Sequence, residues 1–317
     1  MREPGGDRVP AIVGPTAVGK TAVAIRVAAE LGCEIVSVDS RQIYRELDIG
    51  TAKPTAEEQA AARHHLLDVA YPTERFSAAT FQRAGDAAIA DIQTRSKRPL
   101  LVGGAGLYLR ALLDGLFEGP PAQPEIRQRL RAEAELDGGE ALHARLSQVD
   151  PVASHRIHRN DTLRLVRALE VYETTGEPIS GLQSQWASGT PRHEAVIVGL
   201  RRPREALNRR ANARIRAMVA DGLVDEVRGL RDRYDREAPA FNGYGYRELW
   251  DCLDGLHSEE KALELLRRNT HRYAKRQLTW FRSDSRVMWV DVADDATTED
   301  VAGAALEAIA SAEKGEE

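Results

Sequence analysis

Gly14-Pro15-Thr16-Ala17-Val18-Gly19-Lys20-Thr21 matches the phosphate-loop pattern G-x-x-x-x-G-K-[ST] at every fixed position. An apolar run, Val9 to Val13, precedes the motif, and Ala22 to Leu31 has the composition of a helix. In such a strand–loop–helix unit the backbone N–H groups converge on a phosphate, and the lysine adds a positive charge. The motif therefore predicts a di- or triphosphate site in which every residue of 14–21 is a candidate ligand, with the Thr21 hydroxyl holding Mg²⁺.

The composition is typical of a globular protein outside membranes. Of 317 residues, 29% are charged and 5% are aromatic, and no apolar run is long enough to span a bilayer. Cys33 and Cys252 are the only cysteines, which gives neither a metal motif nor a disulfide framework. Residues 1–7 are polar and Gly-rich, without an apolar signal segment. We therefore expect a protein of the reducing cytoplasm that has no membrane partner.

The net charge of −5 hides a strong segregation of charge along the chain. Arginine concentrates in 201–216 and 267–286, and arginine with histidine in 155–167, whereas acidic residues collect in 291–317. A single basic stripe is usually a solvated helix face. Three such stripes, together with the Gly/Tyr/Arg cluster at 243–247, favour binding of a nucleic acid or a polyphosphate.

The order of apolar runs predicts the fold class. Strand-like runs alternate with helical patterns in the first third of the chain, which implies a mostly parallel sheet with ligands at its C-terminal edge. A Gly/Pro-rich break at 119–124 precedes a purely helical stretch. We predict a P-loop NTPase-like α/β core, residues 1–119 and 194–317, interrupted by a small helical insertion domain, residues 120–193. The expected core helices are 78–94, 204–221, 224–234, 246–253 and 259–282, with a loop at 176–191 and a last strand at 287–292.

Asp39 directly follows the strand-like run 34–38. A motor ATPase or GTPase needs an acidic residue at a later strand end to hold Mg²⁺, but the run 99–102 ends in Gly103-Gly104. An aspartate beside a bound polyphosphate can accept a proton from an incoming nucleophile, although an N-cap or metal-shell aspartate has the same sequence pattern. Two classes therefore stay open: a small-molecule kinase, and a transferase whose donor is a diphosphate ester.

Longer motifs resemble those of a known family. The segments DSRQIYRELDIGTAKP (39–54), PLLVGGAGLYLRALLDG (99–115) and GYGYRELW (243–250) are similar to those of the tRNA dimethylallyltransferases of bacterial type, and the resemblance covers nearly the whole chain. It implies transfer of a dimethylallyl group from dimethylallyl diphosphate to N6 of an adenosine, with release of pyrophosphate. That adenosine lies immediately 3′ of the anticodon in tRNAs that read codons beginning with U. The resemblance also implies Mg²⁺, and we expect a monomer.

The resemblance assigns catalytic roles to individual residues. Lys20, and Thr21 with Mg²⁺, would neutralise the departing pyrophosphate. Asp39 would be the base, and Thr16 would contact the donor. Arg214 matches a position at which the family sets an arginine on the pyrophosphate; the alternative is an ordinary residue of its basic stripe.

The resemblance also places tRNA contacts along the chain. The expected contacts are Asp39, Ser40, Arg41, Gln42, Ala105, Arg127, Leu163, Arg164, Leu165, Val166, Arg167, Asn242, Gly243, Tyr244, Gly245, Tyr246 and Arg247. Tyr244 and Tyr246 could instead pack in the core beside a turn. Ala105 stands where the family commonly has threonine, so a hydroxyl is missing from the expected channel.

Two other functions share parts of this pattern. A free adenine-nucleotide isopentenyltransferase would need the core but neither the basic stripes nor the helical insertion. A small-molecule P-loop kinase would consume ATP and would need a lid with arginines. The basic insertion favours the anticodon stem-loop of tRNA as the acceptor.

Overall fold

The computed structural model describes residues 8–116, 119–187 and 190–315. The chain divides into two compact units: a core unit, Met1–Leu113 with Arg192–Glu317, and a helical unit, Asp114–Pro191. The predicted division lies a few residues from these bounds. The polar segment 1–7 lies outside the described residues. Within the described ranges, no helix combines the length and the apolar character that a membrane crossing requires.

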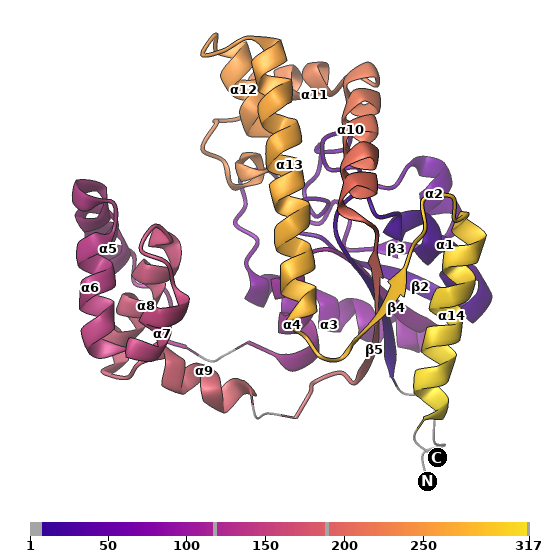
Figure 1. The fold of residues 1–317 in the computed structure, drawn as a ribbon, viewed down its shortest axis with the longest axis horizontal. Coiled ribbons are helices and arrows are strands. Elements are labelled where there is room, and N and C mark those ends of the chain that lie inside the picture. The colour runs from indigo at the N-terminus through magenta and orange to yellow at the C-terminus, as the bar shows by residue number, and fades with distance from the viewer. Residues whose placement is uncertain (1–7, 117–118, 188–189, 316–317) are drawn as a thin grey trace. The chain divides into compact units, whose positions relative to one another are not determined.

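The core unit is built on a parallel sheet, which confirms the predicted α/β class (Figure 1). In the described part of the chain the sheet has the order β3-β2-β4-β1-β5-β6. The strands are β1 Val9–Val13, β2 Cys33–Val38, β3 His64–His65, β4 Arg98–Gly103, β5 Ala195–Arg201 and β6 Val287–Asp291. Because β4 lies between β1 and β2, Val13 and Val38 both pair with Gly103. The phosphate loop and Asp39, which follow β1 and β2, therefore meet at one edge of the sheet.

Alternate residues of the strands pack into two separate cores, one on each face of the sheet. On one face, Ile12 and Ile35 pack with α1 Lys20–Leu31 and α14 Thr298–Lys314. On the other face, Ala11 and Val36 belong to a core that includes α3 Ala78–Thr94 and α4 Gly106–Asp114. The sheet is thus covered on both faces, as a parallel sheet requires.

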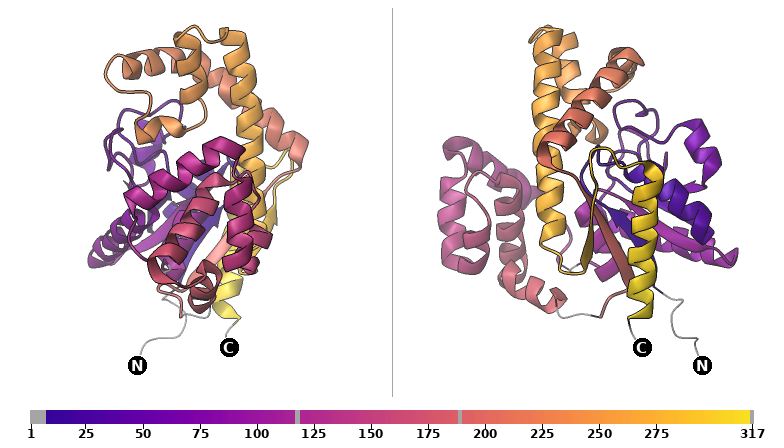
Figure 2. Two further views of the ribbon diagram at one scale, coloured as in Figure 1. Left: turned by 90° about the vertical axis from the view of Figure 1, so that its left-hand side faces the viewer. Right: turned by 45° about the vertical axis from the view of Figure 1, so that its right-hand side comes forward.

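A further group of helices rises from the C-terminal edge of the sheet (Figure 2). It consists of α10 Arg204–Ala220, α11 Leu223–Arg231, the 3₁₀ turn η1 Pro239–Asn242, α12 Tyr246–Leu253 and α13 Glu259–Arg282. The short α2, Ala56–Ala61, begins with a capping box between Thr55 and Glu58. These helices matter for function because α10 and α13 border the site described below.

The helical unit has its own core. Its helices are α5 Pro124–Asp137, α6 Glu140–Val149, α7 Pro151–Arg156, α8 Thr162–Thr175 and α9 Ile179–Ala187. Leucines of α5, α6 and α8 fill the centre, among them Leu130, Leu146 and Leu165. Glu170 is fully buried there, and its carboxylate accepts hydrogen bonds from the guanidinium groups of Arg127 and Arg167.

One expectation about elements was wrong, and one long helix was not predicted. Residues 179–187 form α9 instead of a loop, and the acidic C-terminal stretch contains the long helix α14. In α14, Val301, Ala305 and Ile309 recur at helical spacing and are buried against the sheet, while the acidic residues occupy the other positions. An apolar stripe of alanines is a weak signal, and the surrounding charge obscured it.

Candidate active site

The phosphate loop adopts a conformation that depends on its glycines. Gly14 has φ 147°, and a Cβ at this position would lie 2.6 Å from the carbonyl oxygen of Leu200. Gly19 has φ 112° and precedes the first residue of α1, Lys20. The Lys20 ammonium lies folded back over the loop, where its Nζ donates to the carbonyl oxygens of Gly14 and Pro15, both at 3.0 Å.

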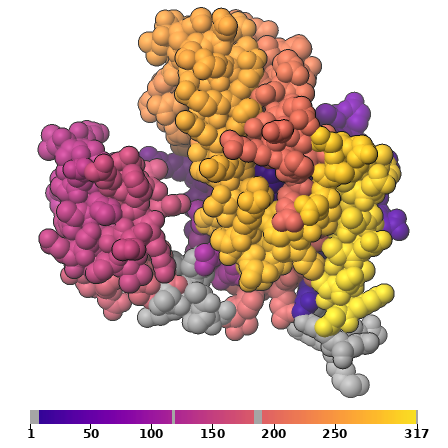
Figure 3. Space-filling view, viewed as in Figure 1, coloured from indigo at the N-terminus to yellow at the C-terminus, as the bar shows by residue number. Residues whose placement is uncertain are grey.

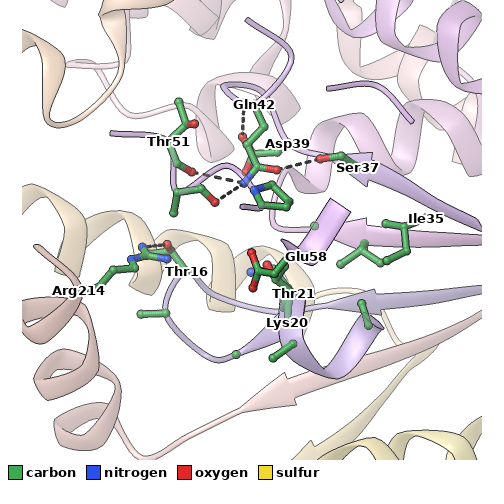
Figure 4. Close-up of a pocket in the computed structure, with 18 of the residues that line it drawn as sticks. Thr16, Lys20, Thr21, Ile35, Ser37, Asp39, Gln42, Thr51, Glu58 and Arg214 are labelled. Carbon is green, nitrogen blue, oxygen red and sulfur yellow. Dashed lines mark hydrogen bonds between the residues drawn. The ribbon is translucent and has the colours of Figure 1, made fainter. Parts of the chain in front are cut away.

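The loop, the ends of β2 and β4, and α10 enclose a cavity of about 460 Å³, which we call the loop cavity (Figure 4). The structure brings the predicted catalytic residues together in its lining: Lys20, Thr21, Asp39 and Arg214. In the space-filling view, a recess between the surfaces of α10 and α13 exposes atoms of the N-terminal part of the chain (Figure 3). The apolar side chains of Ile35 and Val102 also line the loop cavity.

The charges of the loop cavity affect one another. Burial lowers the pKa of Lys20 from 10.5 to about 8; the Asp39 carboxylate opposes this shift, and Arg214 adds to it. Burial also lowers the pKa of Arg214 from its ordinary value. The Arg214 guanidinium donates to the Thr16 hydroxyl, while its buried Nε has no hydrogen-bond partner among the described residues. An unpartnered cationic donor beside a phosphate loop indicates an anion site.

Asp39 begins a tight turn at the end of β2. Its Oδ1 accepts the backbone N–H groups of Arg41 at 2.7 Å and Gln42 at 3.3 Å, which fixes the carboxylate. The Gln42 side chain is fixed in turn: its Oε1 accepts from Ser37 Oγ at 3.1 Å, and its Nε2 donates to the carbonyl oxygen of Ala52 at 2.9 Å. The carboxylate is therefore held in one orientation before any ligand arrives.

A second cavity, of about 360 Å³, shares Thr16, Asp39, Thr51 and Arg214 with the loop cavity. We call it the tyrosine cavity, because Tyr244 and Tyr273 line it. Their ring centroids lie 5.6 Å apart, and the Arg276 guanidinium lies 5.5 Å from the Tyr244 ring and bonds its hydroxyl. The predicted residues Ser40, Arg41, Asn242 and Gly243 complete much of the wall. Asp39 thus lies where the two cavities meet.

Sequence reasoning missed three residues of α13: Tyr273, Arg276 and Gln277. Gln277 is buried, accepts the backbone N–H of Thr16 at 2.8 Å and donates to the carbonyl oxygen of Gly104 at 3.0 Å. It therefore connects the phosphate loop to the glycines that end β4. Positions i, i+3 and i+4 lie on one face of a helix, so this spacing within the basic stripe 267–286 was the available signal.

Several expected tRNA contacts have side chains that are either buried or held by other groups of the protein. Leu165 and Val166 are buried in the core of the helical unit, and Tyr246 is buried with its hydroxyl bonded to Glu226. Arg127 and Arg167 are bonded to the buried carboxylate of Glu170.

Other expected contacts lie where a nucleic acid could reach them. Leu163 is 72% exposed, and the side chain of its neighbour Arg164 is 65% exposed. Asn242, Tyr244 and Arg247 are exposed around Gly243 and Gly245, both of which are buried. Ala105 precedes α4, and its backbone N–H donates to the carbonyl oxygen of Val38 at 3.2 Å.

The donor set of the loop cavity consists of hard oxygen atoms. Thr21, Asp39 and Glu58 line it, and hydroxyl and carboxylate oxygens are ligands that Mg²⁺ accepts. Among the residues that the structure describes, no group of three or more His, Cys, Asp or Glu could hold a metal ion. The Thr21 hydroxyl therefore has the chemistry to hold Mg²⁺ beside a bound diphosphate.

Comparison with known proteins identifies the same class of enzyme. The family model described as IPP transferase matches residues 42–284. A tRNA dimethylallyltransferase of Symbiobacterium thermophilum is 50% identical over 282 residues, which are 89% of this chain and 88% of that one. A counterpart from Geobacillus kaustophilus is 47% identical over 292 residues, 91% of each chain. The crystal structure of a full-length tRNA isopentenylpyrophosphate transferase from Bacillus halodurans is 40% identical, with a TM-score of 0.71 over 98% of this chain and 99% of that one.

Proposed function

The chain belongs to the IPP transferase family, and on that premise we propose that it transfers a dimethylallyl group from dimethylallyl diphosphate to tRNA. The acceptor is N6 of the adenosine immediately 3′ of the anticodon in tRNAs reading codons that begin with U, and pyrophosphate is released. One observation carries the proposal: a phosphate-loop cavity and a cavity with aromatic and arginine side chains share the Asp39 carboxylate.

The loop cavity suits the diphosphate of the donor. The loop amides, Lys20 and Arg214 offer positive charge and hydrogen-bond donors where the bond to the leaving oxygen breaks. Because these groups gain most from the charge that develops on pyrophosphate, they stabilise the transition state more than the bound donor. The apolar walls at Ile35 and Val102 are compatible with a five-carbon chain.

Asp39 suits the role of general base. As the new C–N bond forms and the C–O bond to pyrophosphate breaks, N6 must lose a proton, and the carboxylate accepts it. The two hydrogen bonds to Oδ1 hold the carboxylate and leave Oδ2 to accept the proton. The proton then leaves to water or to the departing pyrophosphate.

Thr21 would hold Mg²⁺ in the loop cavity. When bound, the ion supplies positive charge to the phosphate oxygens. The protein's own contribution is the position of the Thr21 hydroxyl at the start of α1, beside the loop amides.

The tyrosine cavity suits a nucleotide taken out of its stack. Tyr244 and Tyr273 offer ring faces, and Arg276 offers a planar cation, the groups on which splayed bases of single-stranded RNA stack. In the helical unit, exposed Leu163 and Arg164 are the proposed tRNA contacts. We also propose that the enzyme acts as a monomer in the cytoplasm.

The test uses the whole chain with three substrate sets in parallel. The chain is incubated with dimethylallyl diphosphate and tRNA, with dimethylallyl diphosphate and AMP, and with ATP and a panel of small acceptors. Mass spectrometry of the nucleosides should find N6-dimethylallyl adenosine in the tRNA alone. Alkylation of AMP in place of tRNA would support the free-nucleotide enzyme, and ATP turnover would support a kinase.

A further inference from the structure

Glu226, in the first turn of α11, binds a loop that lies outside its own helix. Its Oε2 accepts the backbone N–H groups of Asp48 at 3.0 Å and Ile49 at 2.7 Å. Its Oε1 accepts the backbone N–H of Gly50 at 3.0 Å and the hydroxyl of Tyr246 at 2.8 Å. One carboxylate therefore accepts four donors, three of them from consecutive residues of the chain.

The loop that Glu226 binds, residues 48–52, forms part of the wall of both cavities. Thr51 lines both of them, Ala52 lines the loop cavity and Gly50 lines the tyrosine cavity. Glu226 itself lines neither cavity, so it has no contact with a substrate held there. Any effect of Glu226 on the reaction must therefore pass through the loop.

A chain of hydrogen bonds leads from the loop to the carboxylate of Asp39. The carbonyl oxygens of Thr51 and Ala52 accept from Gln42 Nε2 at 3.4 and 2.9 Å. The backbone N–H of Gln42 then donates to Asp39 Oδ1. Displacement of the loop would remove the acceptors that orient the Gln42 side chain and would loosen the residue whose backbone N–H helps to hold Asp39.

The ring of Tyr246 packs closely against the 48–52 loop at Gly50. A Cβ at Gly50 would lie 2.6 Å from the ring of Tyr246, so the glycine permits the ring to approach the backbone. Burial, and then the charge of Glu226, raise the pKa of Tyr246 well above its ordinary value. Its hydroxyl therefore stays protonated and remains a donor to Glu226. A glutamine could not replace the carboxylate, because its NH₂ group would face N–H donors.

We propose that Glu226 is a positioning residue for the transfer reaction: it anchors the 48–52 loop and thereby holds Gln42 and Asp39 in the geometry that proton transfer from the adenosine requires. This inference rests on the proposed function. A positioning role and a merely structural role predict different effects on kcat and on donor affinity. Loss of the anchor lowers kcat, while the diphosphate site, which is built on the phosphate loop and α10, keeps its affinity.

The test compares Glu226→Gln with the full-length wild-type enzyme. A misplacement of reacting groups by about 1 Å costs on the order of 100-fold in rate, so we expect kcat to fall about 10- to 100-fold. The KM for dimethylallyl diphosphate should stay within about 3-fold, because uniform binding is untouched. Hydrogen–deuterium exchange should become faster in peptides that contain residues 48–50, whose amides lose their acceptor.

Asp225→Asn is the matched control. Asp225 lies in the same turn of α11, is exposed and pairs with Arg228 instead of the loop. This variant should keep both wild-type kcat and slow exchange at 48–50. If Glu226→Gln fails to fold, Gly50→Ala displaces the loop from the Tyr246 side, and the same selective loss of kcat is expected.

The proposal would be overturned by unchanged exchange at 48–50 in Glu226→Gln, or by faster exchange with an unchanged kcat. Equal changes in kcat and in the affinity for pyrophosphate would also contradict it, because they indicate general loosening. If the wild-type enzyme transfers nothing to tRNA, the proposed function fails and the catalytic role falls with it. The exchange comparison would still report separately whether Glu226 anchors the loop.

Discussion

At the scale of single residues, the unusual charge is that of Lys20. Its pKa of about 8 means that the ammonium is lost in a range where ordinary lysines stay charged. We therefore predict that inorganic pyrophosphate binds the free enzyme more weakly as the pH rises through about 8. Titration of pyrophosphate affinity between pH 7 and 9.5 measures this effect. Lys20→Met, which carries no charge at any pH, corrects for ionisation of pyrophosphate itself.

The lowered pKa of Lys20 also predicts how the free energy of unfolding changes with pH, because proton binding and stability are linked. The folded-state pKa of Lys20 lies below the ordinary 10.5, so the unfolded chain binds more protons between about pH 8 and 10.5. The Lys20 contribution to stability must therefore rise with pH across that window. It follows that Lys20→Met should melt at a higher temperature than the wild type at pH 7. A lower melting temperature would show that the bonds to Gly14 and Pro15 outweigh the cost of burying the charge.

Asp39 provides the third residue-scale prediction. Asp39→Asn keeps the size of the side chain and the oxygen that accepts from Arg41 and Gln42, but it cannot take a proton. General-base catalysis contributes about 10²- to 10⁴-fold, so kcat should fall by that order while the Kd of pyrophosphate changes by less than about 3-fold. Single-turnover rates and pyrophosphate binding measure the two effects. A parallel loss of both would make Asp39 a binding residue.

Residue-scale predictions from the sequence depend on how local the signal is. The sequence predicted that the phosphate loop and Asp39 line one site because each signal lies within a few consecutive residues. Gln277 could not, since only tertiary packing brings this α13 residue to Thr16. The burial of Leu165 and Tyr246 could not be predicted either, because tertiary packing decides which residues of a motif face the core.

At the scale of elements, strong periodicity gave correct bounds. The helices α3, α12 and α13 begin and end at the predicted residues, because each has a clear apolar stripe between polar ends. The helices α4, α9 and α14 were not predicted. Their apolar stripes are short or rich in alanine, so the difference in hydrophobicity between the buried and exposed faces is small. The sequence also contained no sign that Glu226 of α11 binds the 48–52 loop, because the Gly50 amide that donates to it lies 176 residues earlier in the chain.

Two arginines of α8, Arg164 and Arg167, were both predicted to contact tRNA, but they have different surroundings in the structure. Arg164 is exposed and pairs with the nearby Asp161, whereas Arg167 donates to the buried carboxylate of Glu170. Arg164→Ala should weaken binding of an anticodon stem-loop and lower its salt slope by about 1, with little change in stability. Arg167→Ala should instead destabilise the helical unit by about 1–3 kcal/mol, because the carboxylate loses a charged partner.

Binding of the stem-loop at two salt concentrations, and urea unfolding of both variants, separate these effects. Arg131→Ala serves as a surface control, since Arg131 is an exposed arginine of α5 in the same unit. An unchanged salt slope for Arg164→Ala would identify Arg164 as part of a solvated helix face and would strengthen the free-nucleotide alternative.

At the scale of the whole molecule, the chain leaves the core unit and returns to it at one point. The carbonyl oxygen of Leu113 accepts the backbone N–H groups of Arg192 at 2.7 Å and His193 at 3.1 Å. The side chains of Arg192 and His193 both bond Asp86 on α3. The two ends of the core unit that flank the insertion are therefore joined by hydrogen bonds within the core unit. The helical unit has a hydrophobic core of its own.

This closure predicts that the helical unit can be removed without loss of the donor site. A variant in which a short Gly/Ser linker replaces residues 116–190 retains every residue that lines the two cavities. Its Kd for pyrophosphate should stay within about 3-fold, while its affinity for tRNA should fall by at least about 10-fold and depend less on salt, because basic contacts are lost. Isothermal titration with pyrophosphate and with tRNA measures both. If the shortened chain alkylates tRNA as fast as the wild type, the helical unit has no part in tRNA binding. If it folds but no longer binds pyrophosphate, the two units are not independent, and the division of labour between them is wrong.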